Sequence, residues 1–372
     1  MIKCAICGER IDVPLFNWRK FPVTDIYTES HGKQFTIDQE FYLCSRCGHG
    51  QLGNQLNKNV LYSTEYAFRT SKGRSKQQNQ IVKDTIPNVY FDNIIEIGCN
   101  DLYLLKQLKS KARNLIGIDP VLEEKSDGKL IAIKEFVEDV DFSKFHGKSL
   151  ILTSHFLEHT EQPRNILESL FQNVNDASIF HFAFPCFDCL LNDGRFDQIY
   201  NHHLQYFSEF SFDCLLNDIG FEKTNRSFIP EYWGTMITTF KKSKSNLILD
   251  SSPKPTKERV IFSYDWFERR MKRAKEAIKN LSDPIYGYGA SLQISVLNYH
   301  LGNELSRLEY ILDDDPNKKG LYPLNLDVQI VEAANMDLKN KNVVITAINF
   351  AKEIKSKLHP LQPRHILNPF GG

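Results

Sequence analysis

The sequence has 372 residues, and its 46 basic and 46 acidic side chains give a formal net charge of zero. This length allows two or three domains, and the 41% of hydrophobic residues suffice for a core in each. A neutral chain lacks the basic excess of a general nucleic-acid binder, so we expect no nucleic-acid partner. The sequence contains no apolar run of about 18 residues and no apolar signal-peptide region after Met1. We therefore expect no membrane insertion, a cytoplasmic location, and cysteines that serve as thiols or metal ligands.

Two Cys-x2-Cys pairs lie near the N-terminus, Cys4 with Cys7 and Cys44 with Cys47, and a glycine follows each pair. Two such pairs can place four thiolates around one tetrahedral zinc ion, with glycine permitting the tight turns. A site with four protein ligands is closed, so this zinc would stabilise the fold and not catalyse a reaction. We predict a zinc-binding domain over residues 1–75. An unmetallated thiol cluster is the alternative, and the neutral charge disfavours a nucleic-acid zinc ribbon.

The segment Asn93–Asp101, Asn-Ile-Ile-Glu-Ile-Gly-Cys-Asn-Asp, predicts a buried strand, a tight turn and the start of a helix. Its apolar run breaks at Gly98, and leucines at helical spacing follow from Leu102 onward. A second strand ends in Asp119, about 20 residues later, where an acid commonly binds ribose hydroxyls. Because ligands of open α/β sheets lie at the carboxyl ends of the strands, we predict a nucleoside-containing cofactor here.

Strand and helix patterns alternate over residues 91–240, within a second domain that we take as residues 76–250. The predicted strands cover 93–97, 114–118, 131–134, 149–153, 178–184, 223–229 and 234–240. The predicted helices cover 77–85 and 207–218. Such alternation predicts an α/β fold with a parallel sheet and helices on both of its faces.

Residues 192–207 concentrate the side chains suited to acid–base chemistry, with Tyr200, His202, His203 and Tyr206 within seven positions. Histidine exchanges protons near neutral pH. Adjacent histidines point in different directions, so the two need not share a role. The alternative is a hydrogen-bonded His–Tyr cluster with a purely structural role.

The third predicted domain, residues 251–372, begins with a linker and a long helix pattern over 259–281. Four strands are predicted in it, one that runs into a turn within 285–291 and three at 308–312, 342–346 and 364–367. They indicate a small doubly wound domain. The turn Gly287-Tyr-Gly-Ala-Ser291 is followed by a strand that ends in acids, and together these features favour phosphate or nucleotide binding.

In this order, the motifs resemble those of the three-domain, S-adenosylmethionine-dependent C-methyltransferases of nucleotide-linked deoxysugars. The shared motifs are the two cysteine pairs, Glu96-Ile-Gly-Cys-Asn-Asp101, Ile118-Asp-Pro120, Ile199-Tyr-x-x-His203, the Gly287 turn and Asp313-Asp-x-Pro-x-Lys-x-Gly320. The resemblance covers nearly the whole chain. It implies a zinc module, a seven-stranded Rossmann-like methyltransferase core, and a C-terminal Rossmann-like domain that helps to hold the nucleotide. The lack of a full Gly-x-Gly-x-x-Gly favours S-adenosylmethionine over a dinucleotide.

The resemblance also implies the site residues. The methyl donor would be bound by Glu96, Gly98, Asn100, Asp101, Asp119, Pro120, Phe136, Ser154 and His155. The substrate, a 4-keto sugar on a nucleoside diphosphate, would be bound by Tyr206, Tyr288, Ser291, Asp314 and Lys318. His203 would take the proton from C3, with Tyr200, His202 and Tyr66 around it. Such a proton can be removed because the enolate spreads its charge onto oxygen, provided that the site supplies a base and a hydrogen-bond donor.

Four residues depart from the pattern of these enzymes. His202 stands where glutamate is usual, Phe68 where tyrosine is usual, Leu102 where a glycine follows Asn-Asp, and Gln293 where a lysine is usual. Methylation of a sugar oxygen or nitrogen, or a sugar-nucleotide-binding protein without catalysis, therefore stays open. We expect a monomer or a small homo-oligomer.

Overall fold

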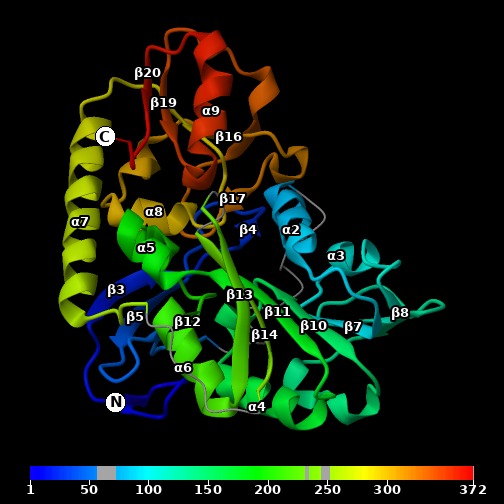
Figure 1. Cartoon of the computed structure of the whole chain (residues 1–372). Helices are drawn as coiled ribbons and strands as arrows, with labels where there is room; N and C mark the ends of the chain where they lie inside the picture. Colours follow the sequence, from blue (N-terminus) through cyan, green and yellow to red (C-terminus); the bar gives the residue numbers. More distant parts are fainter. Residues whose placement is uncertain (57–72, 231–233, 244–251, 372) are drawn as a thin grey trace.

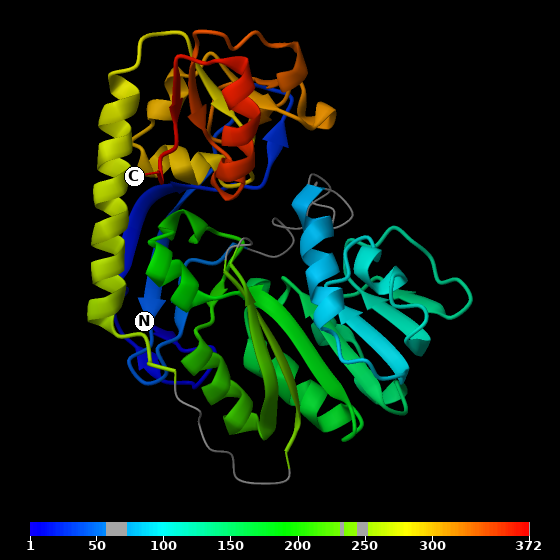
Figure 2. The ribbon, with the colours of Figure 1, turned by 45° about the horizontal axis from the view of Figure 1, so that its top comes forward.

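The computed structural model describes residues 1–56, 73–230, 234–243 and 252–371, with side chains from residue 76 onward in the second range. In Figure 1, the long helix α7 (Lys257–Lys279) runs along one side, from the N-terminal strands to the C-terminal unit. Figure 2 shows the blue N-terminal strands extending from the central unit to the C-terminal unit. In the ranges given above, no helix combines the length and apolar character needed to cross a membrane.

The central unit is built on a seven-stranded sheet in the order β13-β14-β11-β10-β7-β8-β9. Its strands are β7 (Phe91–Ile97), β8 (Ala112–Ile118), β9 (Leu130–Ile133), β10 (Ser149–Ser154), β11 (Ile179–Pro185), β13 (Phe221–Ile229) and β14 (Thr235–Lys242). β14 runs antiparallel to both of its neighbours, so the prediction of a parallel sheet was wrong at this strand. Only residues 230–234 separate β13 from β14, too few for the crossover that a parallel pair needs.

The helices of the central unit are α2 (Gly73–Thr85), α3 (Tyr103–Lys106), α4 (Pro163–Asn173), α5 (Phe187–Asp193) and α6 (Glu209–Ile219). α6 begins at a capping box, in which the Ser208 and Ser211 side chains each accept the other residue's backbone N–H. It ends at Gly220, whose φ of 108° suits glycine. The helical pattern seen from Leu102 onward yields only the single turn of α3, which begins after a left-handed Leu102 and ends at Lys106.

The N-terminal segment shares sheets with both other units. Its strands are β1 (Ile2–Lys3), β2 (Arg10–Ile11), β3 (Phe16–Pro22), β4 (Tyr27–Thr28), β5 (Thr36–Leu43) and β6 (Gly50–Leu52). β6 pairs with β12 (Gln205–Tyr206) of the central unit, and β4 pairs with β17 (Tyr322–Pro323) of the C-terminal unit. The N-terminal segment thus joins the other two units.

The C-terminal unit has a five-stranded parallel sheet in the order β18-β16-β15-β19-β20. Its strands are β15 (Ile285–Tyr288), β16 (Tyr310–Asp313), β18 (Ile330–Glu332), β19 (Asn342–Ile345) and β20 (His365–Leu367). Its helices are α8 (Ile294–His300) and α9 (Ala351–Leu358). The predicted doubly wound domain is confirmed, since β15 has neighbours on both sides to which the chain crosses in parallel.

One apolar cluster contains buried side chains from all three units. Trp18 and Phe41 come from the N-terminal segment, Phe196 from the central unit, and Phe267 and Val344 from the C-terminal part. Such a shared core packs the units as one body. The domain boundaries predicted near residues 75 and 250 stay predictions.

Candidate functional site

The four paired cysteines come together at one point. Cys4 Sγ lies 3.6 Å from Cys47 Sγ, Cys7 Sγ lies 3.5 Å from Cys44 Sγ, and all four sulfurs fall within 4.8 Å of one another. In a tetrahedral zinc site with Zn–S bonds of about 2.3 Å, sulfurs lie about 3.8 Å apart, so this cluster could hold zinc. Hydrogen bonding with Cys4 and Cys44, together with burial, raises the pKa of the Cys47 thiol. A bound cation would lower this pKa again, because it stabilises the thiolate form.

The turn after β7 lies where the winding of the sheet reverses, since β10 flanks β7 on one side and β8 on the other. Ligands of such sheets bind at this switch point. Gly98 has a φ of 73°, and a Cβ there would fall 2.6 Å from the Phe156 ring, so the turn requires glycine. Asp119 Oδ2 accepts the Asn100 N–H at 2.9 Å, and its Oδ1 accepts the Val121 N–H at 3.0 Å. Gly98, Asn100 and Asp119, which are predicted to bind the methyl donor, thus form or stabilise one turn.

Glu96, on β7, is buried beneath this turn. Burial raises the pKa of its carboxyl well above the ordinary value, and the charges of Asp101 and Asp119 raise it further. Within the described ranges, its Oε2 atom makes no hydrogen bond. The protonated form of Glu96 is therefore favoured, and its carboxyl group can donate a hydrogen bond beside the turn.

Leu102 keeps the backbone conformation that glycine favours, with φ 60° and ψ 18°. Its side chain is fully buried, and its Cδ2 would lie 2.2 Å from a Cβ added at Gly117. The leucine thus fills the space left by Gly117 on β8. The departure at this position places a side chain in the core beside the strands.

Four other residues predicted to bind the methyl donor lie at or after the carboxyl ends of neighbouring strands: Pro120, Phe136, Ser154 and His155. Ser154 Oγ donates to Asn79 Oδ1 at 2.8 Å, which ties the end of β10 to α2. His155 Nε2 lies 3.0 Å from Thr235 Oγ1, and its Nδ1 lies 3.0 Å from Glu158 Oε1. The structure therefore gathers these residues along one edge of the sheet.

Tyr200 and His203 form a direct side-chain pair on the loop after η4 (Phe196–Gln198), with Tyr200 Oη 2.9 Å from His203 Nε2. Burial raises the pKa of the Tyr200 phenol well above its ordinary value. Burial and three neighbouring imidazoles lower the pKa of His203 well below its ordinary value. The pair is thus a neutral phenol that donates and a neutral imidazole that accepts. Tyr206, predicted at the substrate, is buried, and its Oη accepts the Tyr200 N–H at 3.2 Å.

Two residues of η3 (Leu157–His159), absent from the predicted acid–base set, lie beside this pair. His159 Nδ1 donates to the His202 carbonyl at 2.7 Å, and the His159 ring centroid lies 5.0 Å from that of His203. Side-chain atoms of Glu158, His159 and His203 fall within 4.8 Å of one another. No local pattern in the sequence connects them, because the contact is made only in the folded chain.

The other two units also contribute side chains at this loop. Asp25 lies between β3 and β4, and its Oδ2 is 3.7 Å from His202 Nε2. Gln293, just before α8, makes a side-chain hydrogen bond to Tyr200 that lowers the pKa of the phenol, against the larger effect of burial. Tyr66 and Phe68 lie outside the described residues.

The predicted substrate residues of the C-terminal unit surround the turn after β15: Tyr288, Ser291, Asp314 and Lys318. Asp313 Oδ2 accepts the Ala290 N–H at 2.7 Å. Lys318 Nζ donates to the Ala290 carbonyl at 2.9 Å and to Asp313 at 3.1 Å. Tyr288 Oη donates to Asp314 Oδ1 at 3.0 Å. An acid at the end of the second strand therefore fixes this turn, as Asp119 fixes the turn after β7.

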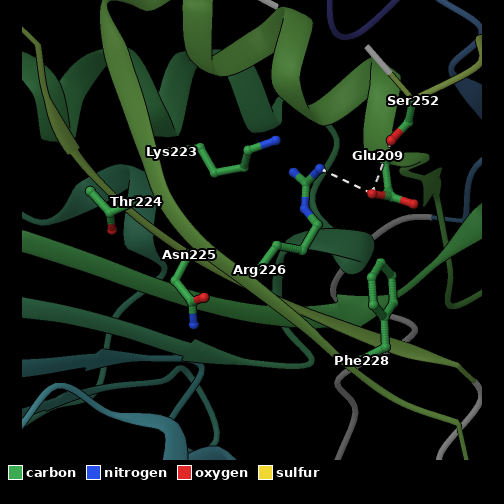
Figure 3. A pocket seen from close by; sticks show the side chains of 7 residues that line it. All are labelled: Glu209, Lys223, Thr224, Asn225, Arg226, Phe228 and Ser252. Carbon is green, nitrogen blue, oxygen red and sulfur yellow. Dashed lines mark hydrogen bonds and ion pairs between the residues drawn. The ribbon is translucent and has the colours of Figure 1, made fainter. Parts of the chain in front are cut away.

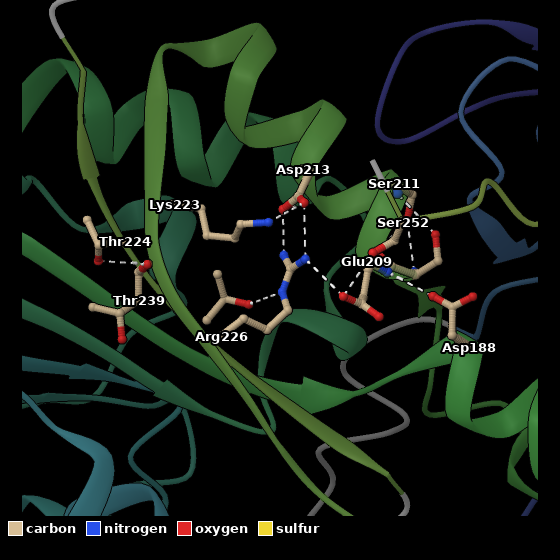
Figure 4. Close-up of polar contacts among 11 residues, drawn as sticks. Asp188, Glu209, Ser211, Asp213, Lys223, Thr224, Arg226, Thr239 and Ser252 are labelled. Carbon is tan, nitrogen blue, oxygen red and sulfur yellow. Dashed lines mark hydrogen bonds and ion pairs between the residues drawn. The ribbon is translucent and has the colours of Figure 1, made fainter. Parts of the chain in front are cut away.

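A wide hollow of about 610 Å³ lies along β13 at the edge of the central sheet (Figure 3). Figure 4 shows Lys223 and Arg226 paired with Asp213. The Lys223–Asp213 distance is 2.8 Å, the Arg226–Asp213 distance is 2.5 Å, and Arg226 also lies 3.5 Å from Glu209. Both cations are neutralised by carboxylates. Charged side chains of this kind protect an exposed sheet edge from pairing with other chains, and we assign the hollow no ligand.

Two family models match the chain. A methyltransferase domain matches residues 63–225, and a C-methyltransferase C-terminal domain matches residues 262–365. A search among curated proteins found no match.

Solved structures that match the chain include the Burkholderia thailandensis 1,6-didemethyltoxoflavin-N1-methyltransferase, at 10% identity and a TM-score of 0.40, covering 55% of this chain and 98% of that one. A putative S-adenosylmethionine-dependent methyltransferase from Listeria monocytogenes has 13% identity and a TM-score of 0.38, covering 46% and 100%. A chain of the complex between the Haloferax volcanii Trm112 methyltransferase activator and the putative methyltransferase has 12% identity and a TM-score of 0.39, covering 46% and 92%.

The first family model matches most of the central unit, whose α/β fold is consistent with it, and the match supports methyltransferase activity. The last unit matches the C-methyltransferase C-terminal domain over residues 262–365.

Proposed function

We propose that the protein transfers a methyl group from S-adenosylmethionine to C3 of a 4-keto deoxysugar carried on a nucleoside diphosphate. The observation that supports this most is the Tyr200–His203 pair, a neutral donor and a neutral base 2.9 Å apart in a buried loop. Removal of a proton next to a ketone requires these two groups.

The turn after β7 would hold the methyl donor, chiefly through Gly98, Asn100 and Asp119. The fit is supported by the switch point at β7, by the glycine that the turn requires, and by Glu96 as a buried donor nearby. Bound there, S-adenosylmethionine supplies an electrophilic methyl group. The second turn, fixed by Asp313 and Lys318, would bind the nucleotide part of the substrate.

At the loop, His203 Nε2 would accept the C3 proton, because its lowered pKa keeps the imidazole unprotonated at neutral pH. The Tyr200 hydroxyl would donate to the enolate oxygen, because its raised pKa keeps the phenol protonated. In the structure these two groups satisfy each other, so the substrate would take the place of their mutual hydrogen bond. Burial of both side chains excludes water from the proton transfer.

The test follows the C3 proton by NMR in deuterated water, on a thymidine diphosphate-linked 4-keto-6-deoxyhexose. We expect exchange of C3–H and methyl transfer in the wild type, and loss of both in His203→Ala with S-adenosylmethionine binding retained in calorimetry. His146→Ala, at an exposed histidine of the same unit, is the matched control. Full activity in His203→Ala would contradict the base assignment, and transfer without C3 exchange would indicate an oxygen or nitrogen acceptor.

We also propose that the four-cysteine cluster binds zinc with a structural role, supported by the sulfur spacing and by the two tight turns. Both glycines that follow the pairs adopt positive φ, and each donates its N–H to the carbonyl of the first cysteine of its pair. A chain without zinc would leave four thiols crowded in a partly buried space.

A further inference from the structure

The segment that carries Asp25 is tied to both other units. The Thr24 N–H donates to Asn201 Oδ1 at 3.3 Å, next to His202 in the central unit. The Asp25 N–H donates to the Leu292 carbonyl at 3.3 Å, next to Gln293 in the C-terminal unit. Asp25 therefore sits where the three units meet, beside the acid–base loop.

Asp25 has features that a purely structural residue would not need. Its side chain is 8% exposed, and within the described ranges its Oδ1 atom makes no hydrogen bond. Its backbone is in the left-handed region, with φ 70°. An unsatisfied buried carboxyl costs several kcal/mol, and such costs are concentrated at functional sites. The remaining oxygen, Oδ2, faces His202 Nε2 at 3.7 Å.

Glu158 is the nearest carboxyl to His203, and the histidines of the loop still outnumber it. His203 has three imidazoles as neighbours, those of His159, His155 and His202, and a positive charge on any of them opposes its protonation. A base in this environment holds a proton poorly unless a carboxylate offsets the new positive charge. Asp25 interacts electrostatically with His159 and with Tyr200, the two side chains that contact His203.

We propose that Asp25 is a positioning residue of this site, whose carboxylate holds the His202 imidazole and supplies the negative charge that offsets the proton taken up by His203. This inference rests on the proposed function. The proton itself passes from C3 to His203, and Asp25 neither gives nor takes it. The chain would thus complete its acid–base site with a carboxyl group from the N-terminal segment.

The proposal sets a pH dependence. Burial raises the pKa of Asp25 to about 7, against the opposing effect of His159, and the other groups that face it are His202, Tyr27 and Tyr200. Burial lowers the pKa of His202 to about 4, and both phenols have raised pKa values, so these three stay neutral near pH 7. His159, with a lowered pKa, is also neutral there. Only Asp25 among these groups changes charge near pH 7.

The first experiment compares pH–rate profiles of methyl transfer to the thymidine diphosphate-linked 4-keto-6-deoxyhexose, at saturating S-adenosylmethionine. The kcat of the wild type should rise as the pH increases through about 7. In Asp25→Asn this rise should vanish, and kcat at pH 8 should fall on the order of tenfold, with KM within about twofold. Asp12→Asn, at an exposed carboxyl of the same segment, should match the wild type. A rise through pH 7 that persists in Asp25→Asn overturns the proposal.

A second experiment does not depend on activity. The ring nitrogens of His202 are followed by NMR in the 15N-labelled full chain from pH 5.5 to 8.5. A change with a midpoint near 7, present in the wild type and absent in Asp25→Asn, supports the pairing. Absence of that midpoint in the wild type overturns it. A wild type that shows the midpoint and binds S-adenosylmethionine, yet leaves the sugar nucleotide unchanged, contradicts the proposed substrate and retains the Asp25–His202 pair.

Discussion

Asp119 Oδ2 accepts the backbone N–H of Asn100 at 2.9 Å, so the acid at the end of β8 fixes the turn at the end of β7. The C-terminal unit repeats this relationship, with Asp313 Oδ2 accepting the Ala290 N–H at 2.7 Å. In both places the Oδ1 atom of the acid accepts the N–H two residues further along the chain. The two doubly wound units therefore present the same kind of turn at their switch points, which supports one bound nucleoside at each.

The repeated turn gives a matched pair of substitutions. Asp119→Asn should weaken S-adenosylmethionine binding on the order of tenfold, because the turn loses a charged acceptor. Asp313→Asn should leave donor binding unchanged and weaken binding of thymidine diphosphate. Isothermal calorimetry with each ligand on each variant checks both expectations. Equal loss of donor binding in the two variants would contradict separate sites.

The cysteine cluster should make the fold depend on metal. We expect about one zinc per chain by elemental analysis, and a fall in melting temperature on incubation with a strong chelator. Cys44→Ser should lose the zinc and reproduce the lower melting temperature, because the three cysteines that remain cannot complete a four-ligand site. Cys99→Ser changes a buried cysteine outside the cluster and should retain the metal. A metal-free chain with unchanged melting temperature would show that the thiols alone suffice.

Strands with a long apolar run were predictable, because burial on both faces leaves a direct signal in the sequence. The turn at Gly98 and the acid at Asp119 were predictable for the same reason, since each follows such a strand. The composition of β14 gives no signal of its antiparallel direction, and only the short connection after β13 indicates it. Asp25 was also invisible, since only the folded chain brings it to His202.

Leu102 gives a prediction in which two effects oppose each other. Leu102→Gly relieves a left-handed leucine, worth about 1–2 kcal/mol. The same change removes a fully buried side chain, and such losses cost about 3–5 kcal/mol when a cavity remains. The net result should be destabilisation by about 2–3 kcal/mol, measured as the free energy of unfolding in urea. Leu102→Ala keeps the strain and loses most of the side chain, so it should be less stable than Leu102→Gly.

Asp25 should reduce stability in a pH-dependent way, whatever its part in the reaction. Burial raises its pKa to about 7 in the folded chain, from an ordinary value of 3.8, so the folded state binds the proton more tightly than the unfolded state between these two pH values. The cost of ionising the buried carboxyl therefore grows as the pH rises through this window, and it is complete above pH 7. From the two pKa values, this cost is about 2 kcal/mol at pH 5 and about 4 kcal/mol at pH 8.

Asp25→Asn removes this ionisation. Its free energy of unfolding should accordingly exceed that of the wild type by a few kcal/mol at pH 8, and by much less at pH 5, in urea titrations at the two pH values. Asp12→Asn, at an exposed carboxyl, should show no such difference between the two pH values. If Asp25→Asn were less stable than the wild type at pH 8, the carboxylate would stabilise the fold, and its burial could no longer be explained by its place beside His202.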